Sequence, residues 1–64
     1  MIRINGKDIA ADGQNLLSYL TDQAYRTDRI AIELNGTIIP RRDYDKVTLK
    51  DGDSMEIVHF VGGG

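Results

Sequence analysis

Two Asn-Gly pairs most constrain how this chain can fold. Asn5-Gly6 and Asn35-Gly36 each lie between short runs rich in isoleucine and other strand-forming residues. A type I′ turn needs positive φ at both central residues, which asparagine and glycine tolerate best, so Asn-Gly between such runs indicates a two-residue hairpin loop. The sequence therefore predicts two β-hairpins, one around each pair.

A two-residue loop also fixes which residues face each other across a hairpin. The expected pairs are Ile2 with Ile9, Ile4 with Lys7, Ile32 with Ile39, and Leu34 with Thr37. Paired residues share a face of the sheet, so each hairpin presents one apolar face to a core. The residues on these two faces are Ile2, Ile4, Ile9, Ile30, Ile32, Leu34 and Ile39.

The segment between the hairpins has helical spacing. Asn15 is a favourable N-cap residue, and an apolar stripe follows it. The stripe consists of Leu16, Leu17, Leu20 and Ala24, with Tyr19 on its flank. A helix this short is marginal by itself, so we expect it to dock on the sheet.

The remaining segments complete the element order. We expect a loop at 27–29, the end of the fourth strand at Pro40, a loop or single helical turn at 41–46, a short strand at 47–49, a turn at 51–53 and the last strand at 55–61. This order predicts an α+β fold of the β-grasp (ubiquitin-like) type, a mixed four- to five-stranded sheet with one helix packed across one face. The first and last strands would lie side by side and parallel in its middle.

Composition limits the classes of function. The 64 residues suit one small domain with little room for a catalytic pocket, so we expect a binding module or a macromolecular substrate and not an enzyme. The chain has no cysteine, which excludes a thiolate nucleophile and a thiolate metal site. A net charge of −2 argues against a nucleic-acid partner. The sequence has no membrane-length apolar run and no recognisable signal peptide, so we expect a cytoplasmic location and no membrane partner. We also expect the free chain to be a monomer.

The chain ends in three glycines. We expect residues 1–61 to form the domain and residues 62–64 to form a flexible tail, because glycine is costly to order and untied chain ends are usually mobile. Gly62 and Gly63 would be slender enough to thread into a narrow cleft on a partner. The α-carboxylate of Gly64 would then be the reactive or recognised group.

Alternation divides the last strand into two faces. Met55 and Ile57 are the expected core residues, so Val58 and Phe60 would face away from the helix. Ile38 would share that exposed side of the sheet. An exposed apolar set just before a reactive tail suggests a partner-docking patch, although scattered exposed apolar residues are also ordinary.

Other candidate residues indicate structural roles. His59 is the one histidine, and without a cysteine or a second histidine it is a poor metal ligand. Asp51 and Asp53 flank a glycine but lack the further acidic ligands of a calcium loop, so we expect them in a turn. Arg41 and Arg42 could contact an acidic partner, but a solvated loop is the safer interpretation. No catalytic triad, phosphate-binding glycine loop or acid–base pair can be assembled.

Six short segments carry a family resemblance. They are Ile4-Asn5-Gly6, Ile32-Glu33-Leu34-Asn35-Gly36, Ile39-Pro40-Arg41, Leu49-Lys50-Asp51-Gly52-Asp53, Glu56-Ile57-Val58 and Val61-Gly62-Gly63-Gly64. In this order and spacing, closed by a terminal diglycine, they resemble the ThiS family, the ubiquitin-like sulfur carriers of bacterial thiamin biosynthesis. Each segment is weak alone, but together they cover essentially the whole chain.

The resemblance implies a reaction cycle at Gly64. An adenylating enzyme of the ThiF type would use ATP and Mg²⁺ to convert the Gly64 carboxylate to an acyl-adenylate, so this chain would bind no cofactor and no metal itself. A sulfur donor fed by a cysteine desulfurase would then give a C-terminal thiocarboxylate, and the thiazole synthase ThiG would accept the sulfur. The carrier would be a co-substrate, with the catalytic groups on its partners.

Three alternatives fit the same sequence. The small subunit of molybdopterin synthase is also a β-grasp sulfur carrier with a terminal diglycine. A ubiquitin-like protein modifier would form an isopeptide with lysine instead of a thiocarboxylate. A plain interaction domain would carry an inert tail.

Overall fold

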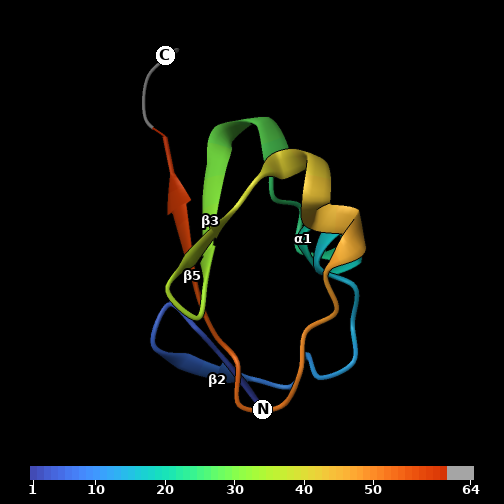
Figure 1. Ribbon diagram of the computed structural model, residues 1–64, viewed down its shortest axis with the longest axis vertical. Helices are drawn as coiled ribbons and strands as arrows, with labels where there is room; N and C mark the ends of the chain where they lie inside the picture. The colour runs from blue at the N-terminus through green and yellow to red at the C-terminus, as the bar shows by residue number, and fades with distance from the viewer. Residues whose placement is uncertain (61–64) are drawn as a thin grey trace.

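The computed structural model describes residues 1–60 and has a five-stranded mixed sheet with one α-helix against one of its faces (Figure 1). In chain order the elements are β1 (Ile2–Ile4), β2 (Lys7–Ile9), α1 (Leu16–Asp22), the 3₁₀ helix η1 (Thr27–Arg29), β3 (Ile30–Leu34), β4 (Thr37–Ile39), the 3₁₀ helix η2 (Arg41–Lys46) and β5 (Ser54–His59). The strand order is β2-β1-β5-β3-β4, with β1 and β5 parallel and the other neighbours antiparallel. This is the predicted β-grasp fold, with the first and last strands adjacent at its centre.

Both hairpins form as the Asn-Gly pairs predict. All four expected residue pairs are present across β1–β2 and β3–β4. Asn5 and Asn35 both have φ of 51°, and they are followed by Gly6 at 81° and Gly36 at 84°. Positive φ at both central positions is what a type I′ turn requires, so turn chemistry alone accounts for these registers.

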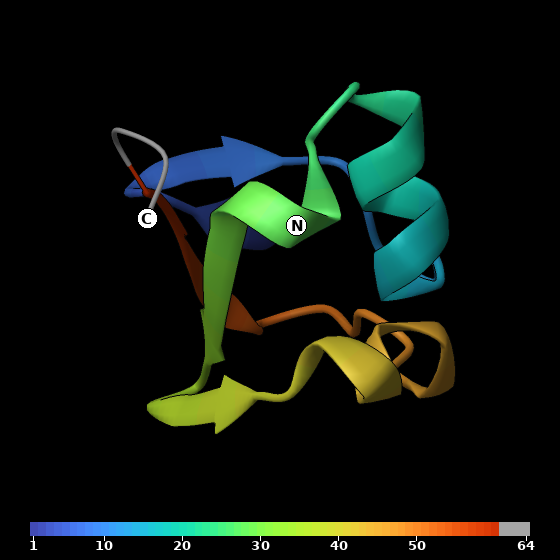
Figure 2. The same cartoon turned by 90° about the horizontal axis from the view of Figure 1, so that it is seen from above.

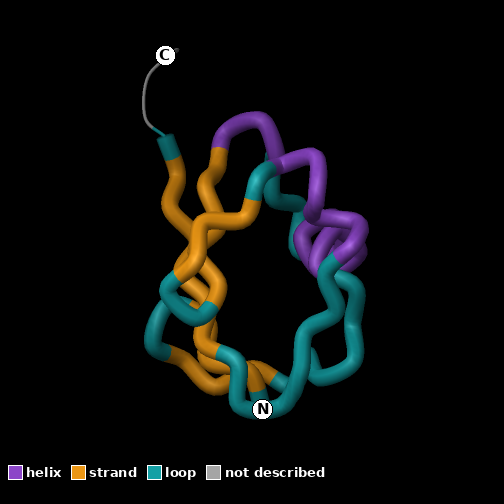
Figure 3. The backbone as a smooth tube through the Cα atoms, in the orientation of Figure 1, coloured by secondary structure: helices purple, strands orange, loops and turns teal. Residues whose placement is uncertain are grey.

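The molecule has two layers with the core between them. Figure 2 shows α1 and η2 on the same side of the sheet, and Figure 3 shows the strands on the other side of the molecule from these helices. The buried apolar side chains are Ile2, Ile4, Ala11, Leu16, Tyr19, Leu20, Ile30, Ile32, Tyr44, Leu49, Met55 and Ile57. The strand residues in this set all come from the sheet face toward α1 and η2, which leaves the opposite face uncovered by these helices.

Helix α1 begins at the predicted cap. The Asn15 side-chain oxygen accepts a hydrogen bond from the Ser18 backbone N–H, 3.2 Å away, which satisfies one of the free N–H groups of the first turn. The Asn15 side-chain amide also donates to the Asp45 carbonyl at 2.8 Å. The cap residue therefore links the start of α1 to η2.

Helix α1 ends in a Schellman motif. The Tyr25 N–H donates to the Leu20 carbonyl at 2.9 Å, and the Ala24 N–H donates to the Thr21 carbonyl at 3.0 Å. Ala24 has φ of 62°, the left-handed conformation that this motif requires and that glycine usually supplies. The helix consequently stops at Asp22.

Two residues of the predicted helix differ from expectation. Ala24 lies beyond the helix and is exposed, so its assignment to the apolar stripe was wrong. Tyr19, expected on the flank, is buried with 6% of its surface exposed. The helical period could not locate the end of α1, because the left-handed position carries alanine and not the usual glycine signal.

The predicted strand at 47–49 is wrong. Thr48 forms an isolated bridge with Asn15. The neighbouring backbone bonds run to the segment around the start of α1, from the Leu16 N–H to the Val47 carbonyl and from the Leu49 N–H to the Gln14 carbonyl, both at 2.8 Å. The alternating pattern here reflects the burial of Leu49 and not pairing within the sheet.

Smaller differences concern element ends. β5 covers 54–59 and not 55–61; Phe60 follows the strand, and residue 61 lies outside the described residues. Residues 27–29 form η1 in place of the expected loop, whereas η2 agrees with the expected single helical turn after Pro40. None of the helices between residues 1 and 60 is long and apolar enough to cross a membrane.

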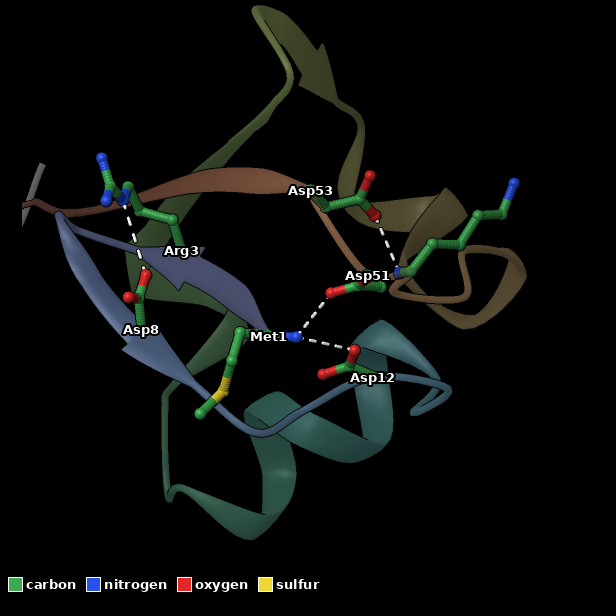
Figure 4. A network of polar contacts seen from close by, with 7 residues as sticks. Met1, Arg3, Asp8, Asp12, Asp51 and Asp53 are labelled. Carbon is green, nitrogen blue, oxygen red and sulfur yellow. Dashed lines mark hydrogen bonds and ion pairs between the residues drawn. The ribbon is translucent and has the colours of Figure 1, made fainter.

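Charged groups tie the N-terminus to two loops (Figure 4). The Met1 amino group donates to the carboxylates of Asp12 at 2.8 Å and Asp51 at 2.6 Å. These hydrogen bonds, that to Asp12 first, raise the pKa of the amine to about 10. The Lys50 N–H donates to Asp53 at 2.9 Å, so Asp51 and Asp53 are turn residues as predicted.

We predict that Ala24→Gly stabilises the fold by about 0.5–1 kcal/mol, because the alanine Cβ strains the left-handed conformation and glycine has no Cβ. The gain is smaller than the full strain, since glycine also gives the unfolded chain more entropy. Urea denaturation followed by circular dichroism measures the change. Ala10→Gly is the control, because Ala10 is exposed without a positive φ and should lose stability; a loss of stability in Ala24→Gly would contradict the prediction.

Candidate functional site

The candidate site is the end of β5, the strand that leads toward the terminal glycines. Figure 1 shows that β5 runs away from the N-terminus and finishes near the start of β3. The predicted tail residues Gly62, Gly63 and Gly64 lie outside the described residues. The described part of the site therefore consists of the contacts that hold β5 and the surface around its end.

β5 is held on both of its edges. Its antiparallel pairing with β3 extends from Leu34 opposite Met55 to Ile30 opposite His59. The Phe60 N–H continues this side with a bond of 2.9 Å to the Arg29 carbonyl. On the other edge, the parallel pairing with β1 comprises two residue pairs. The strand before the glycines thus occupies the centre of the sheet.

The Asn5 side chain extends the short pairing between β1 and β5. Its amide nitrogen donates to the Ile57 carbonyl at 3.2 Å, and its oxygen accepts from the Ile57 N–H at 2.7 Å. The amide takes the place of a backbone peptide group beyond the end of β1. A carboxylate in this position could accept one bond but could not donate the other.

Asn35 makes a related contact from the second hairpin. Its side-chain oxygen accepts from the Ser54 N–H at 2.9 Å, and its amide nitrogen donates to the Asp53 carboxylate at 2.9 Å. Its backbone N–H also donates to the Ser54 carbonyl at 2.7 Å. Both hairpin turns are therefore hydrogen-bonded to β5, and the second turn is also bonded to Asp53 just before this strand. From the sequence, these asparagines were predicted only to form the turns, and their side-chain contacts with β5 were missed. The one sequence signal for these contacts is that both turns have asparagine at the first central position.

The three predicted docking residues are exposed on the face of the sheet away from α1. The exposed fractions are 54% for Val58, 57% for Phe60 and 64% for Ile38. Ala31 lies opposite Val58 across β3–β5. We call Ala31, Ile38, Val58 and Phe60 the outer patch. Its role in docking stays a prediction.

An open groove adjoins this patch at the end of β5. It is lined in part by Ala31, Ile38, Phe60 and Arg41. Asp28 also lines it, and the Arg26 guanidinium, 3.0 Å away, lowers the pKa of that carboxyl. The lining of the groove therefore combines apolar side chains with the charged groups of Asp28 and Arg41.

His59 is the last residue of β5 and is exposed. Its ring lies 5.3 Å from that of Tyr25, centroid to centroid, with a tilt of 31°. No group of three or more potential metal ligands occurs among residues 1–60. Arg41 and Arg42 are exposed on η2, in agreement with the solvated interpretation.

Comparisons with known proteins identify similar chains. The family model described as the ThiS family matches residues 2–64. The sulfur carrier protein ThiS of Bacillus subtilis is 38% identical over 66 residues, and the match covers all of both chains. The crystal structure of the thiamine biosynthesis protein ThiS from Geobacter metallireducens superposes with a TM-score of 0.76 at 31% identity, covering 98% of this chain and 97% of that one.

A longer relative combines a similar segment with other sequence. The thiazole synthase of Magnetococcus marinus is 34% identical over 64 residues. The match covers 98% of this chain but 20% of that protein, so the chain spans a fifth of the length of this relative.

We predict that Asn5→Gly destabilises the fold by about 1–3 kcal/mol, because two hydrogen bonds to Ile57 are lost while the turn geometry stays favourable. Chemical denaturation measures the loss. Gly6→Ala is the companion variant, since it strains the turn and leaves the amide in place. An Asn5→Gly protein as stable as the wild type would contradict the prediction, because it would mean that the two hydrogen bonds to Ile57 add nothing to the stability of the fold.

Proposed function

This chain belongs to the ThiS family, and from that premise we propose that it is a sulfur carrier whose Gly64 carboxylate is adenylated and then converted to a thiocarboxylate. The observation that carries the proposal is the similarity to the Bacillus subtilis sulfur carrier over the full length of both chains. The sulfur would serve formation of the thiazole ring of thiamin. We further propose a cytoplasmic location.

The chemistry requires activation because a free carboxylate is a poor acyl donor. In the proposed first step, a Gly64 carboxylate oxygen attacks the α-phosphorus of ATP, and pyrophosphate leaves. A sulfide-level sulfur from the donor then attacks the acyl carbon, AMP leaves with the former carboxylate oxygen, and the sulfur stays on Gly64 as the thiocarboxylate. The chain has no cysteine that could carry the sulfur, so the sulfur donor and the catalytic groups would belong to its partners.

Two enzymes are the proposed partners. One is a ThiF-type adenylating enzyme, which supplies ATP and Mg²⁺, with sulfur derived from a cysteine desulfurase. The other is a thiazole synthase, which accepts the sulfur. The Magnetococcus marinus relative supports the second partnership, because a protein named thiazole synthase contains a segment similar to nearly all of this chain.

The outer patch is the proposed docking surface. Two of its residues, Val58 in β5 and Phe60 just after it, come shortly before the glycines in the chain, so a partner that covers them also approaches the start of the tail. Gly62 and Gly63 would then enter the partner without side-chain clashes. The two edge contacts of β5 support this arrangement by fixing the strand from which the tail departs.

We predict a gain in intact mass equal to the replacement of one oxygen by sulfur when the chain is incubated with ATP, Mg²⁺, the adenylating enzyme, a cysteine desulfurase and cysteine. Mass spectrometry measures it. Omission of ATP and deletion of Gly64 should each abolish the gain. A lysine-linked conjugate would favour a protein modifier, and an unchanged mass with an enzyme active on another carrier would contradict the proposal.

We predict that Phe60→Ala weakens association with the adenylating enzyme about tenfold, because a central aromatic side chain contributes strongly to many interfaces. Thermal stability should change little, since Phe60 is exposed. Calorimetric titration measures the affinity. Leu17→Ala on α1, which packs against the core, is the control for a general loss of stability. Equal affinities of wild type and Phe60→Ala would remove this residue from the docking surface.

A further inference from the structure

The two glutamates of this chain face each other. Ten residues are acidic, and all except Glu33 and Glu56 are aspartates. The register of β3 against β5 places Glu33 directly opposite Glu56. Both are exposed, and both alternate with core residues, so they lie on the same outer face as the outer patch.

From the register alone, we expect this pairing to be unfavourable for the isolated fold. Side chains directly opposite on antiparallel strands have Cβ atoms about 4.5–5.5 Å apart, and like charges at that spacing destabilise a sheet. No lysine or arginine among residues 1–60 forms an ion pair with either glutamate. Arg3, which lies on the same outer face, pairs instead with Asp8 at 3.6 Å (Figure 4).

The glutamate pair adjoins the outer patch. Ile38 lies opposite Glu33, so β4, β3 and β5 contribute Ile38, Glu33 and Glu56 to one row across the sheet. The next outward-facing row on β3 and β5 contains Ala31 and Val58. Figure 2 shows α1 and η2 on the opposite side, so neither helix covers these rows. An apolar surface and two adjacent carboxylates therefore form one continuous face.

We propose that Glu33 and Glu56 are a recognition site for a cationic side chain of the adenylating enzyme, whose apolar residues cover the outer patch next to it. Arginine fits best, because its planar guanidinium has donors for two carboxylates at once. The inference rests on the proposed function, which supplies the partner. Charge complementarity favours a cation: a positive group placed between the two carboxylates would attract both and offset their mutual repulsion.

A purely structural role predicts a different balance of effects. If the pair served the fold, its neutralisation would lower stability. The proposed role requires the opposite, a rise in stability together with a loss of partner affinity. Glutamine is the appropriate replacement because it preserves the size of the side chain and one of its oxygen acceptors while removing its charge.

The experiment compares Glu33→Gln, Glu56→Gln and the double variant with the wild type. Thermal midpoints should rise by ~1–6 °C when the repulsion is removed. Calorimetric titration with the adenylating enzyme at two salt concentrations should give an affinity about tenfold lower for the double variant, with a weaker salt dependence. Asp22→Asn is the matched control for the two single variants, because it also removes one negative charge, on α1, and it should bind as the wild type does.

Each outcome decides the inference. Tight wild-type binding that is unchanged in the double variant would overturn it and leave the proposed function standing. An equal loss of affinity in Asp22→Asn would also overturn it, by showing an effect of net charge alone. Absence of wild-type binding, together with an unchanged mass under activation conditions, would overturn the proposed function and this inference with it.

Discussion

The parallel pairing of β1 with β5 is the constraint on which the rest of the structure depends. It joins segments from the two ends of the sequence through only two residue pairs, Arg3 with Ser54 and Ile4 with Met55. Closing so long a loop costs entropy before any contact compensates for it. Burial of Ile4 and Met55 offsets part of that cost, and the two bonds from the Asn5 amide to Ile57 lengthen the junction. Asn5 thus forms part of the first turn and also hydrogen-bonds the central strand β5.

Features encoded by neighbouring residues could be predicted from the sequence, whereas features that depend on distant partners could not. Asn-Gly chemistry gave both hairpin registers because a turn is a local structure. The same local view missed the contact of Asn5 with Ile57, and it assigned 47–49 to a strand because alternation does not distinguish burial from pairing. At the site, alternation predicted the exposure of Val58 and Phe60. It could not reveal that Glu33 faces Glu56, since no turn specifies the pairing of β3 with β5.

The two faces of the sheet differ in burial, and the proposed docking residues lie on the exposed face. Its inner face carries Ile2, Ile32 and Met55, which are fully buried against the helical layer. A domain of this size has a small core, so few of its core residues can be replaced by residues that serve binding without a loss of stability. The outer face is free of that demand, so it can hold exposed apolar side chains and a repulsive carboxylate pair. The proposed docking surface of this carrier therefore lies on the face of the sheet opposite the core.

The position of the glutamate pair agrees with this difference between the two faces. Glu33 and Glu56 form the fourth pair of the β3–β5 pairing, which has five residue pairs and is the longest in the described sheet. Ile32 opposite Ile57 packs into the core on the inner side of the same strands, adjacent to the repulsion. An unfavourable term of less than about 1 kcal/mol is tolerable there because the flanking pairs hold the register.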